Sequence, residues 1–123
     1  MIRIESRTYT GTAAAQEVLM GAGPDFALTK RINGTVTAAY TLWRGMPRNS
    51  ANVPGASQAS KANQIMDLTR DGVYVGSGQS QSAALYAAVT IKGLRGSKHF
   101  ATGRFSTNNV DNRTFSGYGA TTI

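Results

Sequence analysis

The 123-residue sequence contains no cysteine, one histidine and no apolar run long enough to cross a membrane as a helix. Without cysteine, the fold can have neither disulfide bonds nor a thiolate metal site, which suits a reducing compartment. The first residues, Met1 to Ser6, lack the apolar segment of a secretory signal peptide. We therefore expect a protein that is made in the cytoplasm, has no membrane contact, and is soluble or part of a soluble assembly.

Acidic residues are also scarce. Six Asp and Glu stand against 13 Lys and Arg, which gives a formal net charge of +7. A positive excess can attract nucleic acid or another anionic partner. The basic residues are scattered, however, and no aromatic RNA-binding signature accompanies them. Direct nucleic-acid binding is therefore disfavoured, and docking on an acidic protein surface explains the charge equally well.

The remaining composition favours strands and turns. Only 15% of the residues are charged and 41% are apolar, and the chain holds 14 glycines but 3 prolines. Small polar, β-branched and glycine residues disfavour long helices. We predict an all-β fold, a single compact β-sandwich or jelly-roll-like domain over residues 1–123.

The clearest local signal is Asn33-Gly34, the preferred sequence of a two-residue hairpin turn. It predicts a hairpin between strands over residues 26–32 and 35–43, with Leu28 opposite Ala39. One face of this hairpin would carry the larger apolar side chains of Phe26, Leu28, Ile32 and Trp43, and the other would carry Val36, Ala38, Tyr40 and Leu42.

Further along, residues 64–69 and 73–75 read as strands joined by an Arg70-Asp71-Gly72 turn. Residues 76–82 read as a flexible connector. Residues 83–91 are rich in alanine and could form a short buried helix, but their β-branched end favours a central strand. A last strand is expected over residues 98–102.

Residues 44–63 form a long segment with few large apolar groups. A loop of this length is usually functional or disordered. It is either a mobile surface loop or an arm that orders against a neighbouring subunit. In the second interpretation the contacts come from Arg44, Met46, Arg48, Val53 and Lys61.

Residues 7–23 and 103–119 carry a similar pattern near the two ends of the chain. The first unit places an Arg-Thr-Tyr-Thr-Gly run before Gly21-Ala-Gly23, and the second places Gly-Arg-Phe-Ser-Thr before Gly117-Tyr-Gly119. Such end units would present open sheet edges, which recruit partners. Tyr9 and Tyr118 lie near turns, so we expect them to be exposed and to anchor an assembly interface.

The sequence offers little for catalysis. His99 is the only histidine available to a Ser-His-Asp site, and no Gly-x-Ser-x-Gly elbow is present. Asp67 and Asp71 are close in sequence, but a turn and the neighbouring Arg70 explain them better than a glycosidase pair does. We expect no enzymatic activity, no catalytic residue, no cofactor and no metal site.

Carbohydrate binding is an alternative function, because exposed aromatic rings stack on sugars. The possible platforms are Trp43, Tyr74, Tyr86 and Tyr118. Since Trp43 and Tyr86 fall within strands, we expect both of them to be core residues.

Several segments in this order also resemble a β-rich module of tailed-bacteriophage virion proteins, which often occurs in tandem copies. The matching segments are Pro24-Asp-Phe-Ala-Leu-Thr-Lys-Arg-Ile32, Tyr40-Thr-Leu-Trp-Arg-Gly45, Asp71-Gly-Val-Tyr-Val-Gly76, Leu85-Tyr-Ala-Ala-Val89 and the stretch from Phe100 to Gly117. Val73 stands where the module usually has Phe.

The resemblance implies a virion structural protein on the outer capsid surface, synthesised in the host cytoplasm. We expect a capsid decoration or cement protein that binds across subunits of the major capsid protein and forms a homotrimer or another homo-oligomer. The alternative is a tail or head-fibre accessory module that binds host glycan or anchors a fibre.

Overall fold

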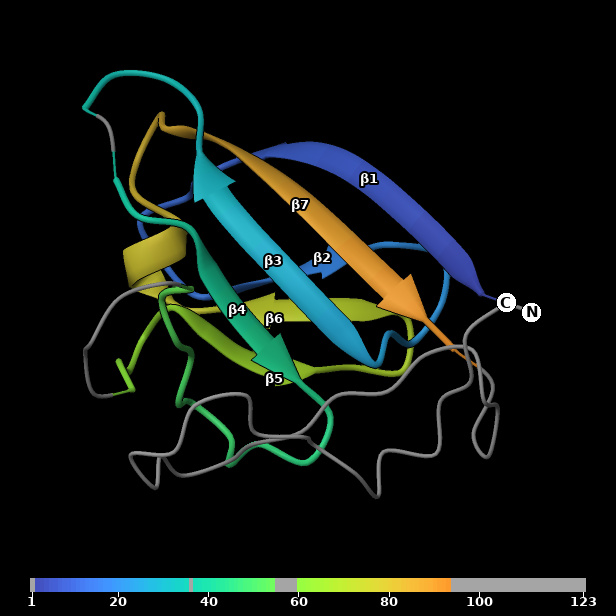
Figure 1. The fold of residues 1–123 in the computed structure, drawn as a ribbon. Helices are drawn as coiled ribbons and strands as arrows, with labels where there is room; N and C mark the ends of the chain where they lie inside the picture. The colour runs from blue at the N-terminus through green and yellow to red at the C-terminus, as the bar shows by residue number, and fades with distance from the viewer. Residues whose placement is uncertain (1, 36, 55–59, 94–123) are drawn as a thin grey trace, which may run out of the picture.

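Two antiparallel sheets pack face to face in the computed structural model, which describes residues 2–35, 37–54 and 60–93 (Figure 1). The larger sheet, sheet A, contains four strands in the spatial order β1 (Arg3–Thr10), β7 (Leu85–Lys92), β3 (Phe26–Arg31) and β4 (Tyr40–Trp43). The smaller, sheet B, contains β2 (Gln16–Leu19), β6 (Gly72–Val75) and β5 (Ile65–Leu68). The predicted all-β sandwich is confirmed.

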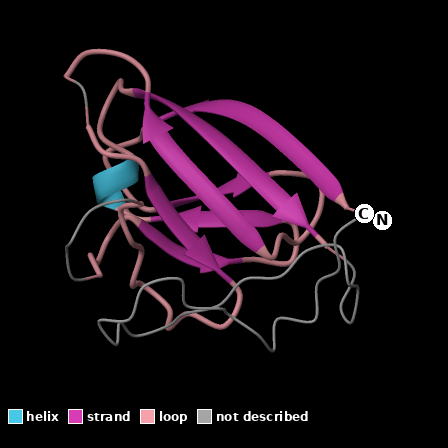
Figure 2. Cartoon of the chain, in the orientation of Figure 1, coloured by secondary structure: helices cyan, strands magenta, loops and turns pink. Residues whose placement is uncertain are grey.

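Helical structure in the described residues is limited to one short 3-10 turn, η1 (Ser77–Gln79) (Figure 2). It lies in the connection between β6 and β7, where the chain passes from sheet B to sheet A. The chain also passes from sheet A to sheet B at the corner between β1 and β2. There Ser80, fully buried, accepts hydrogen bonds from the Ala13 and Thr12 backbone and from the Gln16 side chain.

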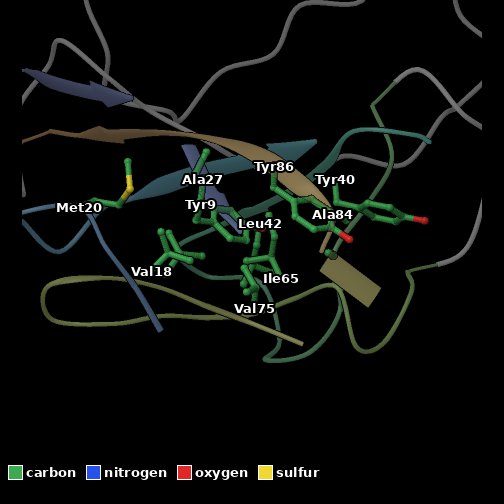
Figure 3. Packing of buried hydrophobic residues seen from close by; sticks show 13 residues of the cluster. Tyr9, Val18, Met20, Ala27, Tyr40, Leu42, Ile65, Val75, Ala84 and Tyr86 are labelled. Carbon is green, nitrogen blue, oxygen red and sulfur yellow. The ribbon is translucent and has the colours of Figure 1, made fainter. Parts of the chain in front are cut away.

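The core fills the space between the sheets with alternate side chains of each strand (Figure 3). Along β7, buried and half-buried residues alternate, as expected for a strand with one face on a core. The rings of Tyr9 and Tyr86 stack with centroids 5.1 Å apart and planes inclined by 12°. Sheet B contributes Val18, Ile65, Val73 and Val75.

The strand predicted over residues 83–91 is present as β7, Leu85–Lys92, which holds sheet A together. It pairs with β1 on one side, from Arg3 opposite Lys92 to Thr10 opposite Leu85. On the other side it pairs with β3. An alanine-rich run becomes a strand here because each small inward side chain leaves room for the stacked tyrosines.

The register of the predicted hairpin is wrong by two residues. Leu28 lies opposite Thr41, and the strands are joined by residues 32–39 instead of a two-residue turn. Asn33 explains the difference: its side-chain oxygen accepts a hydrogen bond from the Leu85 backbone at 2.8 Å. Asn33 is therefore tied to β7, and the chain turns later. A shift of two residues leaves the side chains of β3 and β4 on their predicted faces.

The β5–β6 turn also differs by one position from the Asp-Gly prediction. The Thr69 N–H donates to the Gly72 oxygen at 2.9 Å, so the turn is centred on Arg70 and Asp71. Gly72 already belongs to β6. A side chain there would collide with the Val18 carbonyl of β2, so this glycine permits close pairing of β2 and β6.

A buried polar group joins the two sheets, and we call its members, Tyr9, Thr29, Gln64 and Gln79, the Gln79 bridge. Gln79 is 2% exposed. Its backbone oxygen accepts from the Tyr9 hydroxyl and its side-chain oxygen from the Thr29 hydroxyl, both at 2.8 Å. Its amide nitrogen donates to Gln64 Oε1 at 3.1 Å. Tyr9 and Thr29 belong to sheet A, whereas Gln64 immediately precedes β5 of sheet B.

We expect Gln79→Ala to lower the free energy of unfolding by about 2–4 kcal/mol, because buried partners on both sheets lose their hydrogen bonds. The matched control is Gln81→Ala, which removes an exposed glutamine whose side chain accepts from Arg31. Its loss should stay below about 1 kcal/mol. Urea unfolding measures both, and equal losses for the two variants would contradict the bridge.

Candidate interaction surface

The outer side of sheet A carries an apolar row that crosses all four strands. The registers place Ile4, Ile91, Phe26 and Trp43 next to one another, from β1 through β7 and β3 to β4. Ile4 is 65% exposed, and the other three are half-buried. Their inward neighbours fill the core, so this row lies on the face opposite sheet B.

At the β3–β4 end of this row the surface is hollowed into an apolar pocket of about 580 Å³. We define the apolar pocket by its lining: Phe26, Leu28, Thr41, Trp43, Asn52, Val53 and Pro54. Two aromatic rings form much of the wall. The Thr41 hydroxyl, one of the few polar groups of the lining, donates to the Asn52 backbone oxygen at 3.4 Å. The pocket therefore suits an apolar side chain.

The wall formed by residues 52–54 is held against β4 by backbone hydrogen bonds. Thr41 and Asn52 exchange two of them, at 2.8 and 2.9 Å. Ala51, fully buried, accepts from the Lys61 N–H at 2.8 Å. The Asn49 side chain accepts from the Asn63 N–H at 2.7 Å. These contacts hold the described residues at both ends of the loop, 44–54 and 60–63, against their own chain.

The residues expected to form an assembly interface in this loop also contact their own chain. Met46 and Val53 are half-buried against the core, and Val53 lines the apolar pocket. Arg48 pairs with Asp67 at 3.2 Å. Lys61 is exposed, as is Arg48. Their interface role stays a prediction, and only Val53 lies on the pocket.

Arg44 has a structural role at one end of sheet A. Its guanidinium bonds to Asp25 Oδ1 at 2.6 Å and to the Pro24 oxygen at 3.0 Å. The other Asp25 oxygen accepts from the Gly93 N–H at 2.9 Å. Asp25 thus ties together the beginning of β3 and the ends of β4 and β7. A smaller polar pocket lies beside this junction, and Arg70 and Lys92 contribute to its wall.

Tyr9 contradicts the expectation of an exposed interface anchor. It is 7% exposed, stacks on Tyr86 and donates its hydroxyl hydrogen to Gln79. Burial, with a smaller contribution from Tyr86, raises the pKa of the Tyr9 hydroxyl. Tyr9 is a core residue because strand alternation turns it inward, although a corner follows it. Tyr118 lies outside the described residues.

The two aromatic residues expected in the core have different positions. Tyr86, 1% exposed, is a core residue as predicted. Trp43 is half-buried on the opposite side of sheet A and lines the apolar pocket. Sequence reasoning also did not identify Asn52 and Pro54. The one available signal was Val53-Pro54, an apolar pair within an otherwise small and polar loop.

Several exposed basic side chains lack an acidic partner among the described residues. Three ion pairs occupy Arg3, Arg44 and Arg48 within the described parts of the chain. Among those same residues, five exposed cations have no ion-pair partner: Arg7, Lys30, Lys61, Arg70 and Lys92. Such a surface attracts an acidic partner over a distance that salt shortens.

Within residues 2–35, 37–54 and 60–93, no group of three His, Asp or Glu side chains is placed to hold a metal ion. The same residues include no helix that could span a membrane. His99 and the unit 103–119 lie outside them. Comparison of the chain with protein-family models, with curated proteins and with solved structures finds no match.

We expect Tyr9→Phe to cost about 1–3 kcal/mol at neutral pH, because the buried Gln79 carbonyl loses its donor. Above the ordinary tyrosine pKa of about 10, the unfolded chain can ionise Tyr9 but the folded chain cannot. The stability difference between wild type and Tyr9→Phe should therefore shrink as pH rises above about 10.

Urea unfolding between neutral pH and about pH 11 tests this expectation. The control is Tyr74→Phe, on the half-buried side of β6, which should leave stability at neutral pH within about 0.5 kcal/mol of wild type. A difference between wild type and Tyr9→Phe that is independent of pH would show that the hydroxyl is accessible for ionisation in the folded protein.

Proposed function

We propose that this protein is a tailed-bacteriophage virion structural protein that decorates the capsid by binding across subunits of the major capsid protein. The virus class rests on the motif resemblance over residues 24–117. The mode of action rests on one structural observation, the apolar pocket between Trp43, Phe26 and Pro54 on the outer side of sheet A. No chemical step is required of the protein.

The pocket provides an anchor of the kind that dominates protein interfaces. Buried contacts to an aromatic or aliphatic side chain supply most of the affinity in such interfaces. Trp43 and Phe26 lie on paired strands, so the anchor is held rigidly before binding. The exposed cations Lys30, Lys61 and Lys92 would steer the protein toward an acidic shell and set its orientation.

Repetition on the capsid lattice would strengthen each contact. A homotrimer, or another homo-oligomer, presents several pockets at once to regularly spaced capsid subunits. Linked contacts of moderate strength then act as one tight interaction. The protein would thereby resist separation of neighbouring capsid subunits, which is the work of a cement protein.

Binding of a host glycan is the second candidate, and the surface position of Trp43 favours it. Sugar recognition needs an aromatic platform together with polar groups that bind the hydroxyls. The pocket has the platform, but the Thr41 hydroxyl already bonds to Asn52 and most of the remaining lining is apolar. The lining therefore favours a protein side chain over a sugar.

Two binding measurements separate these functions. The first is saturation binding of purified protein to purified expanded capsids of the phage that encodes it, at several salt concentrations. Capsid decoration predicts saturation at a fixed number of lattice sites, with weaker binding at higher salt. The second is a glycan array. Specific glycan binding without capsid binding would reject capsid decoration in favour of the fibre-associated module.

A charge on the pocket rim should weaken capsid binding. Pro54 is exposed and lines the apolar pocket, so Pro54→Glu places a carboxylate against the anchoring side chain. We expect capsid affinity to fall by at least about tenfold. Pro47→Glu is the matched control, since Pro47 is an exposed proline of the same loop outside the pocket lining. Equal affinities for the two variants would exclude the pocket as the anchor.

A further inference from the structure

A strand can take the position of β1 in sheet A only if its sequence satisfies the pairing and the side-chain contacts of that position. β1 is an edge strand and pairs only with β7 in the sheet as described. The Gly11 N–H donates to the Ala84 oxygen at 2.8 Å, so hydrogen-bonded pairs recur at every second residue along this ladder. Any replacement strand must keep both this ladder and the inward and outward alternation of side chains.

Four positions of β1 and its end are specified by contacts. Ile4 lies outward, opposite Ile91. Arg7 donates to the Leu19 oxygen at 2.8 Å. Tyr9 stacks inward on Tyr86. Gly11 must be glycine, because a side chain there would overlap the Gln81 carbonyl oxygen.

A second stretch of the same chain meets all four demands. Residues 110–117 read Val-Asp-Asn-Arg-Thr-Phe-Ser-Gly, and residues 4–11 read Ile-Glu-Ser-Arg-Thr-Tyr-Thr-Gly. Every pair of residues in this alignment is identical or chemically close. The arginine, the inward aromatic residue and the closing glycine recur as Arg113, Phe115 and Gly117. This alignment is closer than the similarity of the units 7–23 and 103–119 described above.

We propose that residues 110–117 of one copy pair with β7 of a second copy in the register of β1, and displace the β1 of that copy. The strand at this edge of sheet A would then be residues 110–117 of another copy of the chain. Because the contact joins different surfaces of the two copies, repetition gives a ring or an open chain of subunits. The proposal is independent of capsid binding.

The Tyr9 hydroxyl decides which of the two strands binds better beside β7. Phe115 lacks the hydroxyl with which Tyr9 satisfies the buried Gln79 oxygen. The copy's own β1 is therefore the better partner and is also tethered to its site, so exchange increases with protein concentration. Tyr9→Phe makes the two strands equal at this position and should increase exchange.

The absence of cysteine permits a direct test by disulfide trapping. Thr8 lies opposite Ala87 at a non-hydrogen-bonded pair, where facing side chains are closest. In the proposed register Thr114 takes the place of Thr8. The Ala87→Cys and Thr114→Cys variants of the full chain are unfolded in urea, mixed, refolded together at high concentration and oxidised. Mass spectrometry then identifies the disulfides that join unlike chains.

We expect the mixed 87–114 disulfide at a yield at least about fivefold above that of an out-of-register pair, Ala87→Cys with Ser116→Cys. The second pair lies on the same face but is displaced by two residues along the strand, beyond disulfide reach. Adding Tyr9→Phe to the Ala87→Cys chain should raise the yield of the first pair. Adding Gly117→Val to the Thr114→Cys chain should reduce it to the out-of-register level, because the new side chain meets Gln81.

The result that would overturn the proposal is a mixed disulfide no more abundant than the out-of-register pair, or one insensitive to Gly117→Val. A double variant, Ala87→Cys with Thr114→Cys in one chain, examines exchange within a single copy. If disulfides form within single chains of this variant while the mixture of single variants gives none between chains, exchange between copies is excluded.

Discussion

The sandwich depends on what fixes the position of one sheet relative to the other, and the Gln79 bridge supplies that constraint. Apolar packing between sheets is strong but tolerates sliding, because it has no direction. Hydrogen bonds do have direction. Gln79 receives hydrogen bonds from Tyr9 and Thr29 of sheet A and donates to Gln64 beside sheet B. A displacement of one sheet would leave buried polar atoms without partners, so the bridge favours one arrangement of the core over its alternatives.

The same constraint positions the candidate interaction surface. With the inner face of sheet A fixed on the core, alternation along β3 and β4 sends Phe26, Leu28 and Trp43 to the outer face. The backbone pair of Thr41 and Asn52 then sets residues 52–54 beside these side chains. The apolar pocket is thus built by a sheet that is rigid because its other face is buried. Such a scaffold lets a small surface bind without first becoming ordered.

The sequence predicted the strands better than the contacts between them. The alternation in residues 26–31 and the β-branched end of residues 85–92 were sufficient to identify β3 and β7 and to assign faces to the side chains. The hairpin register was not predictable from Asn33-Gly34, because the competing partner of Asn33 is Leu85, far away in the sequence. Residues 76–82 resemble a flexible connector, yet the segment contains the buried Gln79 and Ser80. Their partners lie in β1, the β1–β2 corner, β2, β3 and the residue before β5, which only the fold brings together.

The pairing of Arg3 with Lys92 has a consequence for how this fold can be combined with other proteins. β1 begins at Arg3 and β7 ends at Lys92, so these two strand ends face each other across one ladder. The Asp25 carboxylate accepts a hydrogen bond from the Gly93 N–H and thereby holds the end of β7 in place. Strand ends that lie side by side can both be joined to one short surface loop of another protein, because the two connection points need not be moved apart. The adjacency of these two strand ends therefore allows a host protein to display the outer face of sheet A to solvent.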